Sequence, residues 1–298
     1  MAKKLVRFDW AIKKLLRHKA NFTILEGFLT ELLRFEVNIV DVLEGEGNKQ
    51  ESDDKYNRAD ILVKSAEGEL MLVEVQNESQ VDRPAIRYFQ RMVYGASKLI
   101  TEYIKEGEPY SQIKKVYSIN IVYFGLGQGT DYVYEYDGKF IGIHNGDVLQ
   151  PTLTQKNEFK VEQIKDIFPK YYVLKVNNFD DVAKNTLDEW VYFLKNSEIK
   201  DSFKAKGLKE ASEKLKEDSL TEEEKIAYRR FQENRRIERS EIETALKEGE
   251  VKGIEKGIEK RDIEIVMSMH SKGFEVEQIG DITGLLTEKI KEIIKNFA

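Results

Sequence analysis

Apolar residues recur at helical spacing near the start of the chain and at strand spacing further on. In residues 8–17 and 22–35 they return every third or fourth position, which predicts two amphipathic helices. Residues 60–65 and 70–76 are short runs rich in Leu and Val, and the segment 66–69 between them reads Ala-Glu-Gly-Glu. This pattern predicts a β-hairpin after the two helices.

Helical and strand patterns alternate through the next part of the chain. Residues 84–105 have helical spacing with Pro84 near the first turn, whereas residues 116–124 are apolar enough for a buried central strand. Short strands are expected near 132–136, 140–144 and 171–175, and a helix is expected over about 180–195. The alternation predicts an α/β domain that ends near residue 200.

The last third of the chain changes in character. Lys, Arg and Glu dominate residues 201 to about 247, which is typical of an exposed helical connector. Gly249, Gly253 and Gly257 follow at four-residue intervals and form one row on a helix. Three short amphipathic segments then separate at Lys272-Gly273 and Thr283-Gly284. We predict a domain over 1–200, a charged helical connector over 201–261, and a small helix-turn-helix-like module over 262–298.

The composition limits the chemistry that the chain supports. It contains no cysteine and only three histidines, which are far apart in sequence, so disulfides, thiolate nucleophiles and local zinc motifs are excluded. A carboxylate-held Mg²⁺ or Mn²⁺ is the metal that this composition permits. The formal net charge of −6 argues against coating of nucleic acid by bulk charge, yet it is compatible with a local basic groove.

The hydropathy of the chain predicts its surroundings. Apolar residues make up 41% of the sequence, which is ample for a packed core. No stretch reaches the roughly 18 apolar residues of a membrane helix, and the first residues are not followed by the apolar segment of a signal peptide. We therefore expect a soluble cytoplasmic protein without a membrane partner.

Two carboxylates and an amide are expected to meet on the predicted hairpin. Glu74 and Gln76 are two positions apart, so both side chains point to the same face of a strand. The turn brings the start of the first strand beside the second, which places Asp60 near Glu74. Two carboxylates this close repel each other unless a cation lies between them, so a divalent metal suits the site. Such a metal supports phosphodiester hydrolysis. Alternatively, Asp60 caps its strand and Glu74 faces solvent.

The helix predicted after the hairpin carries a basic stripe. No acidic residue occurs from position 83 to position 101, and four cationic side chains recur along one side of the helix: Arg83, Arg87, Arg91 and Lys98. A basic face beside an acidic metal site suits a polyanionic substrate. Gln90 and Tyr94 share a face of the same helix, where an amide and a phenol can orient a nucleotide or a metal-bound water. The alternative is an ordinary solvated helix face.

The order of these residues resembles a known family. Asp60, thirteen residues, Glu74-Val-Gln76 and then Gln90-x-x-x-Tyr94 is similar to the pattern of the PD-(D/E)XK nuclease superfamily. Within it, the chain resembles the bacterial recombination-promoting nucleases or putative transposases over its first two thirds. The resemblance implies a restriction-endonuclease-like α/β core, in which helices flank a mixed sheet, followed by an α-helical C-terminal extension. It also implies a metal-dependent DNA endonuclease with Mg²⁺ or Mn²⁺ as its cofactor.

The resemblance further assigns roles to single residues. Asp60 and Glu74 match the metal-binding carboxylates, and Gln76 takes the place of the motif's lysine. Gln90 and Tyr94 match a trailing helix motif. Asp9 matches an acidic residue that opens the first helix and is an additional metal-side candidate, although helix capping explains it equally well.

Position 76 departs from the family's pattern. A glutamine cannot give the attacking water or the transition state the positive charge of a lysine. Its amide can still orient a water by hydrogen bonding. The proline that usually precedes the aspartate is also absent, since Arg58-Ala59 precedes Asp60. A catalytically silent DNA-binding or oligomerising protein that keeps the nuclease fold is therefore the alternative.

The glycine row leaves two interpretations open. Each glycine inside a helix costs about 0.5–1 kcal/mol relative to alanine, so a row of three indicates either close approach of another helix or a flexible tether. The first interpretation predicts a homo-oligomer held through the C-terminal helices. In the last segment, Lys289, Lys291 and Lys295 are interleaved with glutamates, which favours a packing or dimerisation unit over a reader of DNA sequence.

Overall fold

One mixed β-sheet lies at the centre of the fold in the computed structural model, which describes residues 5–43, 61–76, 84–103, 109–110, 113–159 and 161–297. Its described strands are ordered β1-β2-β3-β4-β6-β5 in space. The parallel pairs are β3 with β4 and β4 with β6, and the other neighbours are antiparallel. The strands are β1 (Ile39–Leu43), β2 (Ile61–Ser65), β3 (Leu70–Gln76), β4 (Val116–Val122), β5 (Val133–Tyr136) and β6 (Lys170–Lys175).

The predicted hairpin is confirmed in the residues that the structure describes. β2 and β3 pair antiparallel with Ile61 opposite Val73, and Gly68 adopts a φ of 86° in the turn between them. This turn needs glycine, because a positive φ is costly for residues with a Cβ. The strands predicted near 132–136 and 171–175 are β5 and β6. The strand predicted at 140–144 is wrong: that segment forms only a local bridge between Ile141 and Val148 outside the sheet.

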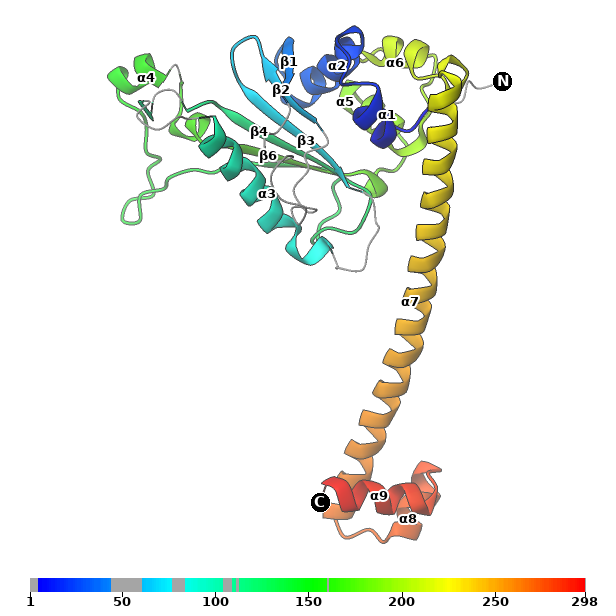
Figure 1. Cartoon of the computed structure of the whole chain (residues 1–298). Helices are drawn as coiled ribbons and strands as arrows, with labels where there is room; N and C mark the ends of the chain where they lie inside the picture. Colours follow the sequence, from blue (N-terminus) through cyan, green and yellow to red (C-terminus); the bar gives the residue numbers. More distant parts are fainter. Residues whose placement is uncertain are drawn as a thin grey trace. The chain divides into compact units, whose positions relative to one another are not determined.

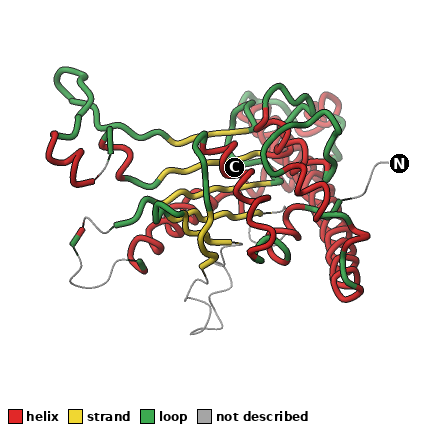
Figure 2. The backbone as a smooth tube through the Cα atoms, turned by 90° about the horizontal axis from the view of Figure 1, so that it is seen from above, coloured by secondary structure: helices red, strands yellow, loops and turns green. Residues whose placement is uncertain are grey.

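Helices cover both faces of the sheet (Figure 1). Alternate strand residues define the two faces: Val73 and Val75 belong to the large core under α1, α2 and α5, whereas Leu70 and Leu72 pack against α3. Seen from above, the strands of the sheet lie side by side (Figure 2). The helices of this part are α1 (Phe8–Lys14), α2 (Phe22–Leu33), α3 (Pro84–Glu102), α4 (Leu153–Phe159), α5 (Thr186–Asn196) and α6 (Leu208–Lys214). The predicted α/β architecture, a mixed sheet flanked by helices, is thus confirmed.

The chain divides into two compact units, Met1–Asn234 and Arg235–Ala298, and the division falls within α7 (Glu222–Ser271). The first unit therefore extends beyond the predicted end at residue 200. Five apolar residues from α6, the following segment and the first part of α7 are buried in its core: Leu208, Ala211, Leu215, Leu220 and Tyr228. Charged residues surround these few apolar positions in the sequence, so their periodicity did not predict that they are buried. Only the later part of the predicted connector, from about residue 235, is exposed along most of its length.

Close backbone contact joins α2 to the turn before α6. A Cβ placed on Gly27 would lie 2.3 Å from the carbonyl oxygen of Lys206 and 2.7 Å from the Cα of Gly207. No real Cβ tolerates those distances, so only glycine permits this approach. The contact fastens the segment after residue 200 to the second helix of the chain.

The second unit has a small core of its own. The end of α7, α8 (Val276–Thr283) and α9 (Thr287–Phe297) enclose Val266, Ile279, Ile290 and Ile293. The helix breaks predicted at Gly273 and Gly284 are confirmed, since both glycines adopt positive φ values between the helices. Lys289 lies 2.9 Å from the buried Asp262, so this lysine helps to hold the unit together.

The glycine row lies on the exposed stretch of α7. A Cβ on Gly249, Gly253 or Gly257 would meet no atom within 4 Å in the described part of the chain. Leu246 and Ile254 nearby are also more than half exposed. The second unit thus leaves this surface to solvent or to another molecule. In the described residues we find no helix with the length and apolar character needed to cross a membrane.

Candidate active site

Glu74 and Gln76 lie on the face of β3 that α3 covers. The parallel register pairs Glu74 with Asn120 and Gln76 with Val122 of β4, and Val122 packs beneath α3 together with Tyr88 and Met92. Glu74 is only 7% exposed. The alternative of a solvent-facing glutamate is therefore wrong, and a carboxylate this deeply buried requires charged or hydrogen-bonding partners.

Arg91 of α3 contacts both of these side chains. Its Nε lies 3.7 Å from Oε2 of Glu74, and its Nη1 donates to Oε1 of Gln76 over 3.5 Å. The sequence predicted that Arg91 lies near the site as a phosphate ligand, but it did not predict a direct contact with the two strand residues. The contact shows that the oxygen atoms of Glu74 and Gln76 face one common space beneath α3.

A buried polar network borders Glu74 and was not predicted from the sequence. Tyr88 donates its hydroxyl to Oδ1 of Asn120 over 3.3 Å, and Asn120 donates to Ser118 Oγ over 3.0 Å and to the carbonyl of Tyr172 over 3.2 Å. The network anchors α3 to β4 directly beside Glu74. Its signal was present in the sequence: Ser118 and Asn120 alternate within an otherwise apolar strand, so they share a face.

The other predicted residues of α3 lie further from the strand. Gln90 and Tyr94 occupy the exposed side of the helix, where Tyr94 is half exposed, and the described contact from α3 to Glu74 and Gln76 comes from Arg91. Arg87 is exposed, and Lys98 pairs with Glu102 over 3.7 Å. Arg87, Arg91 and Lys98 thus form a stripe at helical spacing, whereas Arg83 lies outside the described residues.

Asp60 also lies outside the described residues. The hairpin register, which pairs Ile61 with Val73, is the one that the prediction for Asp60 requires. Its role as the second carboxylate therefore stays a prediction.

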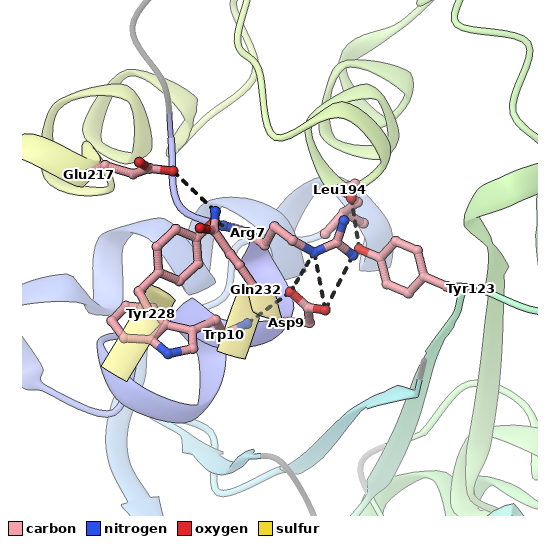
Figure 3. Close-up of polar contacts among 8 residues, drawn as sticks. All are labelled: Arg7, Asp9, Trp10, Tyr123, Leu194, Glu217, Tyr228 and Gln232. Carbon is pink, nitrogen blue, oxygen red and sulfur yellow. Dashed lines mark hydrogen bonds and ion pairs between the residues drawn. The ribbon is translucent and has the colours of Figure 1, made fainter. Parts of the chain in front are cut away.

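Asp9 is held by an arginine at the start of α1 (Figure 3). Nε of Arg7 lies 3.1 Å from Oδ1 of Asp9, and the same oxygen accepts the backbone N–H of Trp10 over 3.0 Å. The guanidinium of Arg7 also lies 5.2 Å from the ring centre of Tyr123, whose backbone N–H donates to the carbonyl of Gln76. Asp9 is thus linked to the end of β3 through Arg7 and Tyr123, while its charge is balanced by Arg7.

A second polar cluster occupies the other end of β3. Glu69 accepts hydrogen bonds from the Tyr117 hydroxyl over 3.2 Å and from Ser65 Oγ over 3.3 Å. Burial raises the pKa of Glu69, and burial lowers the pKa of the neighbouring Lys115 to about 8. The Lys115 ammonium donates to the carbonyl of Phe168. These contacts hold the hairpin turn against the adjoining loops and explain the cluster without a ligand.

The described oxygen atoms fit part of a divalent-metal site. Glu74 offers a carboxylate and Gln76 an amide oxygen on one surface, which are the ligand types that Mg²⁺ and Mn²⁺ prefer. Among the described residues, however, no group of three His, Cys, Asp or Glu side chains lies close enough to bind a metal. A complete site would therefore need a ligand from outside those residues, and Arg91 contacts the two side chains that would contribute these oxygens.

Comparison with known proteins gives one match. A family model described as PD-(D/E)XK nuclease family transposase matches residues 6–245. Searches of curated proteins and of solved structures found no match. The matched region contains the whole sheet, α3 and the first part of α7.

Proposed function

Because the chain belongs to the PD-(D/E)XK nuclease family transposases, we propose that it is a DNA endonuclease that requires Mg²⁺ or Mn²⁺. One observation carries this proposal: the buried carboxylate of Glu74 and the amide of Gln76 lie on the same face of β3, beneath a helix that bears cationic side chains. Burial of a charged group is costly, so a buried carboxylate beside a basic helix supports a functional role for this site.

Each residue has a distinct part in the proposed hydrolysis. Asp60 and Glu74 would hold the metal, which when bound would supply polarisation of the phosphoryl group and ionisation of water. Gln76 orients the attacking water through its amide. Arg87 and Arg91 neutralise the phosphate, while Lys98 extends the same stripe along α3.

Gln90 and Tyr94 have a separate role in the proposal. Both lie on the exposed side of α3, where they can contact a nucleotide of the bound DNA. Transposition is not part of the proposal, because hydrolysis of DNA does not by itself establish strand transfer.

The proposal predicts cleavage that depends on both the metal and Asp60. Purified wild type and Asp60→Ala are incubated with plasmid and with linear DNA in Mg²⁺, Mn²⁺ or EDTA. We expect wild type to nick or linearise the plasmid with either metal, and we expect EDTA or the substitution to remove this activity. Circular dichroism confirms that the variant is folded. Equal cleavage by the two proteins would exclude Asp60 from the site.

A catalytically silent protein is the second candidate. Two observations favour it. Glutamine replaces the motif's lysine at position 76, and Arg91 contacts the side-chain oxygens of Glu74 and Gln76 that a metal would need. Such a protein would bind DNA or assemble through its helices without cutting. A folded wild type that binds DNA but cleaves none of it under any of these conditions would support this candidate.

We also propose that the chain forms a homo-oligomer through the exposed stretch of α7. The row of Gly249, Gly253 and Gly257 allows another helix to approach closely, and exposed apolar residues lie beside it. Gly253→Leu is expected to weaken self-association roughly tenfold, because a bulky side chain separates the helices. Sedimentation velocity over a range of concentrations measures this change. Glu255→Leu, two residues away on the opposite side of the helix, is the control, and a tether would show no difference between the two variants.

A further inference from the structure

Arg91 contacts both oxygen-bearing side chains that are proposed to receive the metal and its water. One guanidinium nitrogen lies 3.7 Å from Glu74 and another lies 3.5 Å from Gln76. The carboxylate of Glu74 is almost buried, so its charge depends strongly on a cation nearby. In this structure Arg91 provides such a cation.

These contacts are weak as hydrogen bonds. The Nε atom of Arg91 is buried and has no hydrogen-bond acceptor among the described residues, because 3.7 Å exceeds hydrogen-bonding distance. The contact to Gln76 is at the upper limit of that distance. Arg91 is therefore held mainly by electrostatic attraction, because its Nε makes no hydrogen bond to a described residue and its Nη1 makes a long one. A phosphate group offers a guanidinium two short parallel hydrogen bonds, which is a better geometry than the present one.

A metal and Arg91 compete for the same oxygens. A divalent ion lies about 2.0–2.6 Å from its oxygen ligands, closer than the guanidinium lies to them here. Two cations at such short separation repel each other. We propose that Arg91 is an exchangeable counter-ion: it neutralises Glu74 in the metal-free protein, is displaced when a metal binds, and then becomes available to the phosphate of DNA. This inference rests on the proposed function, because it assumes that Glu74 binds the metal.

The exchange predicts that removal of Arg91 strengthens metal binding. Isothermal titration of Mn²⁺ without DNA is carried out on wild type, Arg91→Gln and Arg87→Gln. We expect Arg91→Gln to bind Mn²⁺ roughly tenfold more tightly than wild type, since no cation has to be displaced. Arg87→Gln removes the same charge one helical turn away at an exposed position, and it is expected to change the affinity less than about twofold at physiological salt. Arg87 is proposed to contact DNA, which is absent from this assay.

Thermal unfolding in EDTA provides a second measurement that needs neither metal nor activity. Arg91→Gln is expected to lower the melting temperature by several degrees more than Arg87→Gln, because the substitution removes a cation that lies 3.7 Å from the buried carboxylate of Glu74. Saturating Mn²⁺ should restore most of this loss. A variant that melts like Arg87→Gln in EDTA would show that Glu74 does not depend on Arg91.

The outcomes separate the inference from the proposed function. Equal or weaker Mn²⁺ binding by Arg91→Gln, or no binding by any variant, would overturn the exchange. DNA cleavage by wild type together with such a result would leave the nuclease proposal intact. Tighter binding by Arg91→Gln, with no cleavage by wild type, would support the exchange and favour the silent candidate.

Discussion

Glu74→Gln is expected to reduce metal-dependent DNA cleavage by roughly a thousandfold, the scale on which loss of one preorganised electrostatic group acts. The amide keeps the size of the side chain but removes the negative charge that the proposed metal needs. Initial rates of plasmid nicking in Mg²⁺ and Mn²⁺ measure this loss. The substitution also leaves Arg91 beside a neutral group, so a modest decrease in melting temperature is expected.

A matched control lies at the other end of the same strand. Glu69→Gln makes the same chemical change in a half-buried carboxylate that accepts hydrogen bonds from Tyr117 and Ser65. It is expected to keep the cleavage rate within about twofold of wild type, because Glu69 lies just before β3, at the opposite end of the strand from Glu74 and Gln76. Unchanged cleavage by folded Glu74→Gln would mean that Glu74 is not part of the catalytic site, and the proposed mechanism would then be wrong.

Trp190→Ala is expected to lower the free energy of unfolding by about 3–5 kcal/mol, the range for truncation of a buried large aromatic residue. Trp190 is fully buried and packs against Phe8, Phe28 and Phe193 at ring-centre distances of 5.5–6.3 Å. Its indole N–H also donates to the carbonyl of Lys206 over 3.0 Å. The substitution therefore removes a packed ring and also the hydrogen bond from α5 to the carbonyl of Lys206. Urea unfolding followed by circular dichroism measures the change.

The control for this substitution lies on the exposed stretch of α7. Leu246 is 66% exposed, so Leu246→Ala is expected to change the stability of the first unit by less than about 0.5 kcal/mol. A loss below 1 kcal/mol for Trp190→Ala would contradict the burial of this ring among Phe8, Phe28 and Phe193.

The local elements of this protein were largely predictable from periodicity. The spacing of apolar residues predicts three elements of the fold: the β-hairpin of β2 and β3, the helix α3 and the buried strand β4. β1 and α4 were not predicted, because five or seven residues with mixed polarity carry little periodic signal. The predicted strand at 140–144 is apolar, yet those residues fold back on themselves instead of joining the sheet.

The candidate site was predictable in part. The shared face of Glu74 and Gln76 follows from strand geometry alone, because alternate residues point the same way. The contact of Arg91 with both residues does not follow from the sequence, since it depends on how α3 crosses the sheet. The hydrogen bonds from Tyr88 through Asn120 to Ser118 depend on the same packing.

By itself, the sequence determined which ligand types the chain offers: with no cysteine, few histidines and carboxylates at strand spacing beside a basic helix, it predicts an oxygen-ligated divalent metal. It also determined where the two glycine breaks divide the C-terminal helices, because a positive φ favours glycine. Only the tertiary structure decided that residues 201–234 complete the core and that Arg91 lies beside Glu74. Both results depend on contacts between segments distant in sequence, and local composition and periodicity do not encode which of the many possible partners a side chain meets.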